Sequence, residues 1–113
     1  MPERGDRDRL EDNLEEAAFI ANALNDIDAA TFQSDETLQR AVLHALQTIG
    51  EASTGLSDQT RSGIPSVPWT QVHAMRNRIV HGYFGIDLEA VWLTAIHDVP
   101  KMVAPVREYL AAS

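Results

Sequence analysis

The sequence contains no cysteine and no long apolar run, and each absence excludes a class of protein. Without cysteine, the chain has neither a disulfide framework nor a thiolate metal site. No apolar run is long enough to cross a bilayer, and the opening stretch MPERGDRDRLEDNLEE lacks the apolar core of a secretion signal. We therefore expect a cytoplasmic protein that makes no contact with membranes.

Positive charge is also scarce, because nine Lys and Arg residues stand against 17 Asp and Glu, for a formal net charge of −8. This balance argues against a surface that coats nucleic acid, since nonspecific affinity for phosphates comes from basic residues. The charge is uneven, however: residues 1–28 hold nine acids and three arginines, whereas residues 29–113 hold eight acids and six bases. A local cationic cleft is therefore compatible with the composition.

The spacing of apolar residues predicts helices throughout. Apolar residues recur at steps of three and four, and no segment alternates as a strand would. With 113 residues the chain can bury one hydrophobic core but not two, so residues 1–113 should form a single domain. The pattern predicts an all-α fold, a compact antiparallel bundle of four to five helices. No phosphate-binding glycine loop is present, and no cofactor is expected.

Caps and prolines predict where these helices begin and end. The first helix carries apolar residues from Leu10 to Leu24, and residues 25–32 form a turn or a short helix. The clearest helix should have its N-cap at Ser34, and the main loop is expected over 62–68. The next helix should run from Trp69 to His81 and end at Gly82, and a further helix with its N-cap at Asp87 should reach Val99. Pro100 and Pro105 should then break or kink the chain, which leaves a short last helix through Tyr109.

The stretch RNRIVHGYF, residues 76–84, interrupts this orderly pattern. At helical spacing the apolar residues Trp69, Val72, Met75, Ile79 and Val80 share one arc, and Arg76 falls within it. A guanidinium among apolar side chains needs an anionic partner. That partner is either an acid from another helix, such as Glu51 or Asp98, or a ligand.

Asn77 and His81 are spaced i, i+4 on the opposite side of the same helix, with His73 one turn before them. In the simplest interpretation Arg76 forms a structural ion pair and His81 complements the dipole at the end of its helix. A metal site at His73 and His81 is not expected, because no carboxylate or third histidine has ligand spacing on that face.

The segment MRNRIVHGYFGIDLEAVW closely resembles the signature of the HepT-like ribonuclease toxins of the HEPN superfamily. That signature is an arginine, a polar residue, three residues, a histidine, one residue and a tyrosine, matched here by Arg76, Asn77, His81 and Tyr83. The resemblance extends to LQRAVLHALQTIGEAS, IPSVPW and DRDRLEDNLEEA, and so covers nearly the whole chain.

This resemblance implies a HEPN-like homodimer in which two motifs face one cleft, and a metal-independent endoribonuclease that acts on RNA as the toxin of a toxin–antitoxin system. Arg76 and His81 would be catalytic and Asn77 would orient His81. A minimal nucleotidyltransferase antitoxin of the MntA type would AMPylate Tyr83 and could join the homodimer in a larger complex. The resemblance gives no role to His73, where the family usually has a small residue.

Positive potential near the motif would have to come from Arg76 and Arg78, helped by Arg40 and Arg61. Arg78 is the candidate for an additional RNA contact. Two other functions stay open: a non-catalytic HEPN module that binds a nucleotide or the partner nucleotidyltransferase, and a structural helical homodimer in which Arg76 is paired to an acid.

Overall fold

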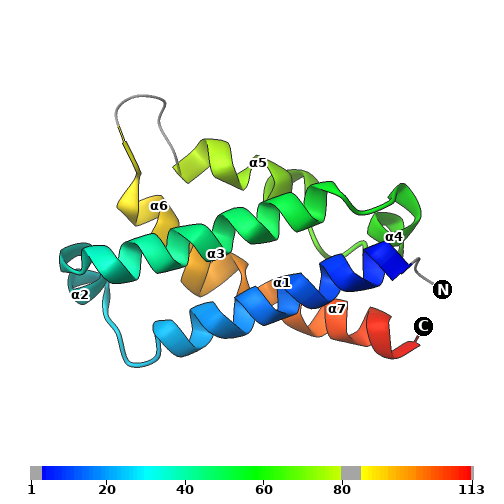
Figure 1. Ribbon diagram of the computed structural model, residues 1–113, viewed down its shortest axis with the longest axis horizontal. Helices are drawn as coiled ribbons and strands as arrows, with labels where there is room; N and C mark the ends of the chain where they lie inside the picture. The colour runs from blue at the N-terminus through cyan, green and yellow to red at the C-terminus, as the bar shows by residue number, and fades with distance from the viewer. Residues whose placement is uncertain (1–3, 80–84, 113) are drawn as a thin grey trace.

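The clearest helix of the sequence forms the centre of the fold. The computed structural model describes residues 4–79 and 85–112, and in it α3 (Glu36–Thr54) lies between α1 (Arg4–Ala23) on one side and α5 (Trp69–Ile79) on the other (Figure 1). The chain runs along α1 and α3 in opposite directions. A last helix, α7 (Pro100–Ala112), packs against α1. The expected all-α fold is confirmed for the described residues.

Short elements connect the long ones. They are α2 (Ala29–Ser34) before α3, α4 (Asp58–Gly63) between α3 and α5, α6 (Leu88–Leu93), and a π-helical turn, η2 (Thr94–Asp98), between α6 and α7. In Figure 1 the end of α5 and the start of α6 lie at the same end of the bundle as α2, whereas α4 lies at the opposite end, near the start of α1.

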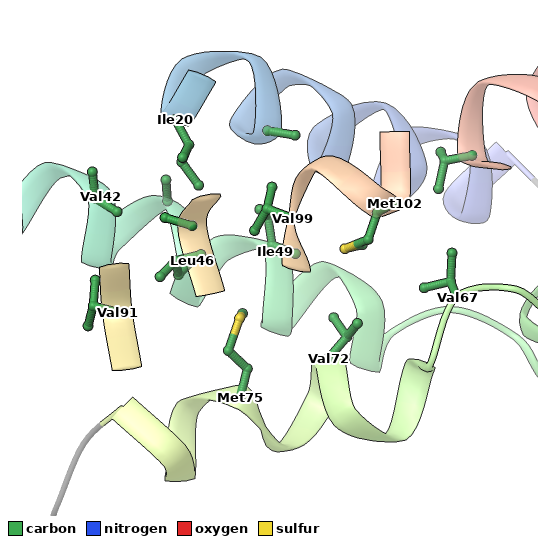
Figure 2. Packing of buried hydrophobic residues seen from close by; sticks show 14 of the residues in the cluster. Ile20, Val42, Leu46, Ile49, Val67, Val72, Met75, Val91, Val99 and Met102 are labelled. Carbon is green, nitrogen blue, oxygen red and sulfur yellow. The ribbon is translucent and has the colours of Figure 1, made fainter. Parts of the chain in front are cut away.

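Buried apolar side chains from all of the long helices meet in one cluster (Figure 2). On α5 the predicted apolar arc is confirmed, because Trp69, Val72, Met75 and Ile79 are all buried. Val80, the last member of that arc, lies outside the described residues. In Figure 2 the side chains of Val72 and Met75 point from α5 toward α3, where Ile49 and Leu46 lie. Burial of this face fixes which side of α5 remains at the surface.

Two predicted boundaries around α3 and α4 are wrong. The N-cap of α3 is Asp35, whose carboxylate accepts a hydrogen bond from the Leu38 N–H at 3.0 Å, while Ser34 ends α2 and donates its hydroxyl to the Thr31 carbonyl. The loop expected over 62–68 is shorter, because α4 continues to Gly63. So short a helix shows no apolar period in the sequence.

The prolines near the end of the chain are accommodated differently from the prediction. The helix expected to reach Val99 gives way at Thr94 to a π turn, in which the Val99 N–H donates to the Thr94 carbonyl at 3.0 Å. Pro100, which has no N–H to donate, then begins α7. Pro105 lies inside α7, which continues past Tyr109 to Ala112 rather than ending as a short helix.

Candidate functional site

The motif begins on the last turn of α5. Pro68 precedes this helix, and the indole Nε1 of Trp69 donates to the Ile64 carbonyl at 3.2 Å, so the first turn of α5 is anchored to the loop before it. Arg76, Asn77 and Arg78 belong to its last turn. Asn77 is exposed, on the side of the helix away from the core.

The rest of the motif lies outside the described residues. His81 and Tyr83 fall in 80–84, as does the helix end expected at Gly82, and the side chains of Arg76 and Arg78 are likewise not described. The ion pair considered for Arg76 with Glu51 or Asp98 therefore stays a prediction. Glu51 is exposed on α3, and Asp98 is exposed in the π turn.

One backbone hydrogen bond joins the two residues that stand before and after the segment with His81 and Tyr83. The backbone N–H of Asp87 donates to the carbonyl of Ile79, the last residue of α5, at 2.9 Å. Asp87 is also the N-cap of α6, as expected, because its carboxylate accepts from the Ala90 N–H at 3.0 Å. Gly85, with φ +99°, has a backbone conformation that other residues rarely adopt. The end of α5 and the start of α6 are therefore held together at Ile79 and Asp87.

Before the motif along α5, a polar hollow of about 340 Å³ lies between the end of α3, α4 and the first turns of α5. Its lining residues are Ser53, Thr54, Arg61, Trp69, Thr70 and His73. Thr70 and His73 are exposed on α5, as is Asn77. Since these positions follow one another at steps of three and four, they form a continuous polar face that leads to the last turn of the helix.

The two arginines expected to assist the motif both form surface ion pairs. Arg40 binds Glu36 at 2.7 Å, and Arg61 binds Asp58. Arg40 lines a second hollow of about 620 Å³, together with Ile86 and Leu88 near the start of α6. Exposed pairs of this kind are each worth only about 0–1 kcal/mol, so a phosphate could compete for either guanidinium.

The position of Arg61 depends on a buried carboxylate that the sequence did not single out. Asp6, only 3% exposed, accepts hydrogen bonds from the Ser57 N–H at 3.1 Å, the Ser57 hydroxyl at 2.6 Å and the Thr60 hydroxyl at 2.7 Å. Burial alone would raise the pKa of Asp6, but the bonds from Ser57 and Thr60, with the nearby charge of Arg9, lower it below its usual value. Asp6 thereby ties the start of α4 to α1.

The opposite end of α4 packs closely on the last helix. A Cβ built at Gly63 would lie 2.6 Å from the ring Cε1 of Tyr109, so the absence of a side chain there makes room for the tyrosine ring. With Asp6 at its start and Tyr109 at its end, α4 is held at both ends despite its six residues.

A signal for Asp6 was present in the pattern of α1. Asp6 and Asn13 occupy the same helical stripe as Leu10, Ala17 and Ile20, at steps of three and four. Asn13 is also buried, and its amide donates to the Ser53 hydroxyl at 3.2 Å. A polar residue on an apolar stripe needs partners inside the protein.

Within 4–79 and 85–112, no group of three or more His, Cys, Asp or Glu side chains is arranged to hold a metal ion. Over the same ranges, no helix has the length and apolar character needed to cross a membrane.

Comparisons with known proteins bear on the whole chain. The profile of the Ribonuclease HepT-like family matches residues 13–109. A probable ribonuclease HepT from Thermococcus cleftensis is 34% identical over 99 residues, which cover 88% of this chain and 90% of that protein. A Methanocaldococcus jannaschii protein with a provisional RNase name is 37% identical over 102 residues, covering 90% of this chain and 94% of the relative.

A third relative, from Caldanaerobacter subterraneus, also has a provisional RNase name and is 33% identical over 104 residues, or 92% of this chain and 93% of its own length. No solved structure matches the chain. The expectation of a ribonuclease is confirmed at the level of the family. From its motif, its helical fold and these matches, the chain belongs to the Ribonuclease HepT-like family.

Proposed function

We propose that this ribonuclease is a metal-independent endonuclease in which Arg76 and His81 are the catalytic residues. The observation that carries the proposal is the Arg76, Asn77, His81 and Tyr83 motif at the end of α5, in a chain of the HepT-like family. The exposed polar face of α5 leads to this motif, and a backbone hydrogen bond joins Ile79, at the end of α5, to Asp87, at the start of α6.

The chemistry requires a base, an acid and positive charge. A neutral His81 takes the proton of a ribose 2′-hydroxyl, the 2′-oxygen bonds to the adjacent phosphorus, and the bond from phosphorus to the 5′-oxygen breaks. A protonated histidine then gives its proton to the departing 5′-oxygen, leaving a 2′,3′-cyclic phosphate. An imidazole with the unperturbed pKa of about 6.5 can perform either role near neutrality, and Arg76 binds the phosphate oxygens.

One motif supplies only one of the two histidines. Arginine stays protonated at working pH and so does not replace the acid. A two-fold homodimer solves this problem, because the partner subunit's His81 reaches the same phosphate. Within each motif Asn77 orients His81, and Arg78 contacts a neighbouring part of the RNA.

We further propose that the protein is a toxin controlled through Tyr83. A partner nucleotidyltransferase would transfer AMP from ATP to the Tyr83 hydroxyl, which bonds to the α-phosphorus as pyrophosphate departs. The bulky anion added there would exclude RNA by its size and its negative charge. Mass spectrometry of Tyr83 after incubation with such a partner and ATP tests this part directly: an unchanged tyrosine would contradict it.

The cleavage proposal is tested by incubating the purified protein with end-labelled RNA in the presence of a chelator. Fragments ending in 2′,3′-cyclic phosphate are expected, and none from His81→Ala or Arg76→Ala proteins with a normal circular dichroism spectrum. Full activity in either variant would remove its residue from the mechanism. His44→Ala is a suitable control, because His44 is exposed and lines a hollow formed by α1 and α3 alone.

Mixed dimers test whether the site is shared between two copies. Wild-type and His81→Ala chains are refolded together in equal amounts, so that about one dimer in four is wholly wild type. If each phosphate needs both histidines, activity falls to about a quarter of the wild-type value. If each motif works alone, activity falls only to about half.

A binding module that cuts nothing is the second candidate, favoured by the pairing of Arg40 and Arg61 with acids. Tight binding of RNA or of the nucleotidyltransferase, with no cleavage under any condition of the assay, would select this function instead.

A further inference from the structure

The polar hollow between α3, α4 and α5 has no part in the chemistry described above. Two of its lining residues, His73 and Arg61, carry groups that bind RNA in other contexts, and they come from different helices. His73 is exposed on α5, so one edge of its ring is accessible from solvent.

The orientation of the His73 ring follows from two hydrogen bonds of Thr54. The Thr54 hydroxyl oxygen lies 2.9 Å from the Gly50 carbonyl and 2.6 Å from Nδ1 of His73. The single hydroxyl proton can go to only one of these two acceptors. When the carbonyl takes it, Nδ1 is the donor to the hydroxyl oxygen, and Nε2 of the neutral ring offers a lone pair that accepts a hydrogen bond.

A phosphate ester cannot donate to this lone pair, because its oxygens only accept. A ribose 2′-hydroxyl can donate, and it is the group that distinguishes RNA from DNA. Within the sugar–phosphate backbone of an internal nucleotide, the 2′-hydroxyl is the only group that can donate to this nitrogen, and DNA lacks it.

Arg61 is placed to bind the phosphate next to such a sugar. Its guanidinium is paired with Asp58, whose side chain is 96% exposed, so the acid is free to swing into solvent when a phosphate arrives. The short helix α4 that carries Arg61 is held by the Asp6 carboxylate and by the Tyr109 ring. A neighbouring hollow of about 110 Å³ shares Thr54 and His73 but carries Glu51, which would repel a phosphate, so Arg61 marks the phosphate side.

The hollow also lies at a suitable distance from the motif. His73 precedes Asn77 by one turn of α5, a rise of about 6 Å, which is comparable to the spacing of successive nucleotides in an extended strand. An RNA strand that follows the exposed face of α5 from Asn77 would reach His73 one nucleotide away.

We propose that this hollow is a ribose–phosphate subsite for the RNA strand, in which His73 Nε2 accepts a hydrogen bond from a 2′-hydroxyl and Arg61 binds the adjoining phosphate. The proposal rests on the ribonuclease function above, and it adds to it the recognition of the sugar of a flanking nucleotide. His73 is a binding residue here and takes no part in proton transfer at the scissile phosphate.

The test measures binding by the full chain carrying His81→Ala, with a fluorescent single-stranded RNA of about 12 nucleotides and its all-2′-deoxy counterpart. The RNA is expected to bind more tightly than the DNA. Adding His73→Ala should reduce this preference by roughly 3- to 10-fold, the effect of one hydrogen bond, without changing DNA affinity. Adding Arg61→Ala should weaken RNA and DNA alike, by roughly 10-fold, because a phosphate contact is common to both.

Matched controls are available in the same chain. His44→Ala and Arg107→Ala remove exposed residues of the same types on α3 and α7, away from this hollow, and should change neither affinity. A second measurement moves a single 2′-deoxy substitution along the RNA. One position should weaken binding to the protein that retains His73 and have no effect on the protein with His73→Ala.

The outcomes separate this proposal from the proposed function. An RNA preference that survives His73→Ala, or a deoxy-sensitive position that survives it, overturns the subsite even if the wild-type protein cleaves RNA. Conversely, loss of the preference on His73→Ala supports the subsite even if the wild-type protein proves to cut nothing. A fall in DNA affinity equal to the fall in RNA affinity on His73→Ala would also overturn it, because the sugar would then be irrelevant.

Discussion

The two faces of α5 differ in what determines their residues. One face, with Val72, Met75 and Ile79, is buried against the rest of the bundle, and each side chain is apolar. The other, with Thr70, His73 and Asn77, is exposed and polar. The residues of the first face could be replaced by other apolar residues of similar volume, because packing requires only their size and apolar character. Packing places no comparable requirement on the exposed residues of the second face. Packing therefore accounts for the residues of the first face and leaves those of the second to solvent exposure or to the proposed function.

The largest expected effect comes from the motif. His81→Ala should lower the rate of RNA cleavage by about 10²- to 10⁴-fold, because a general acid–base group is removed, while the thermal unfolding midpoint stays close to that of the wild type. Cleavage rates and melting curves measured on the same preparation check both parts. A large loss of stability together with the loss of activity would place His81 among the packing residues instead.

The buried side should respond in the opposite way. Ile79 is fully buried at the end of α5, so Ile79→Ala should lower the free energy of unfolding by about 2–5 kcal/mol through lost burial and a cavity. Denaturant titration measures this loss. Thr70→Ala, on the exposed face of the same helix, should change stability by less than about 0.5 kcal/mol. Equal effects from the two substitutions would remove the distinction between the faces.

A smaller effect is expected at the support for α4. Asp6→Asn should reduce stability by about 1–3 kcal/mol, because the buried amide cannot accept all the hydrogen bonds that the carboxylate accepts from Ser57 and Thr60. Asp8→Asn, at an exposed position of α1, is the control.

The same carboxylate predicts a dependence of stability on pH. Its folded-state pKa is lowered, so the stabilisation is present above the unfolded pKa of about 3.9 and is lost as the pH falls through the folded value. Unfolding measured from neutral to strongly acidic pH should show this loss in the wild type and less of it in Asp6→Asn. Identical pH profiles for the two proteins would contradict the role given to Asp6.

The smallest effect tests the orientation of His73. Thr54→Val keeps the shape of the side chain but removes the hydroxyl that holds Nδ1, and should reduce the preference for RNA over DNA by roughly 3-fold. Thr48→Val is the matched control, because the Thr48 hydroxyl bonds to the His44 carbonyl at 3.1 Å in the same way without holding an imidazole. Equal effects of the two substitutions would show that the Thr54 bond to His73 does not matter for binding.

Sequence patterns predicted the elements whose cause is local. The helical spacing of α1, α3 and α5 follows from burial of one face, and the cap at Asp87 follows from the residue itself. The helix α4 was not predicted, because its six residues show no apolar period. Ser57 caps it locally, but the carboxylate that holds Ser57, that of Asp6, lies 51 residues away in the chain. Similarly, Asp35 displaced Ser34 as the cap of α3 because its backbone is extended, with φ −112° and ψ 95°.

The candidate site likewise has one part that the sequence shows and one part that only the structure shows. The motif was identified by its likeness to a family. Its residues Arg76, Asn77, His81 and Tyr83 lie close enough together in the chain to be recognised from the sequence. The resemblance gave no role to His73, and its contact with Thr54, on another helix and 19 residues away, could not be inferred from the sequence. Only the packing of α3 against α5 reveals that Nδ1 of His73 contacts the Thr54 hydroxyl, which leaves Nε2 as the nitrogen for a ligand.

The hydrogen bond between the Asp87 N–H and the Ile79 carbonyl also bears on how this family can diverge. It joins the end of α5 directly to the start of α6, so the contact between these two helix ends does not depend on the residues between them in the chain. Substitutions between Ile79 and Asp87 could therefore accumulate in relatives without moving α5 or α6. The family can vary the side chains of this segment while keeping the same helical core.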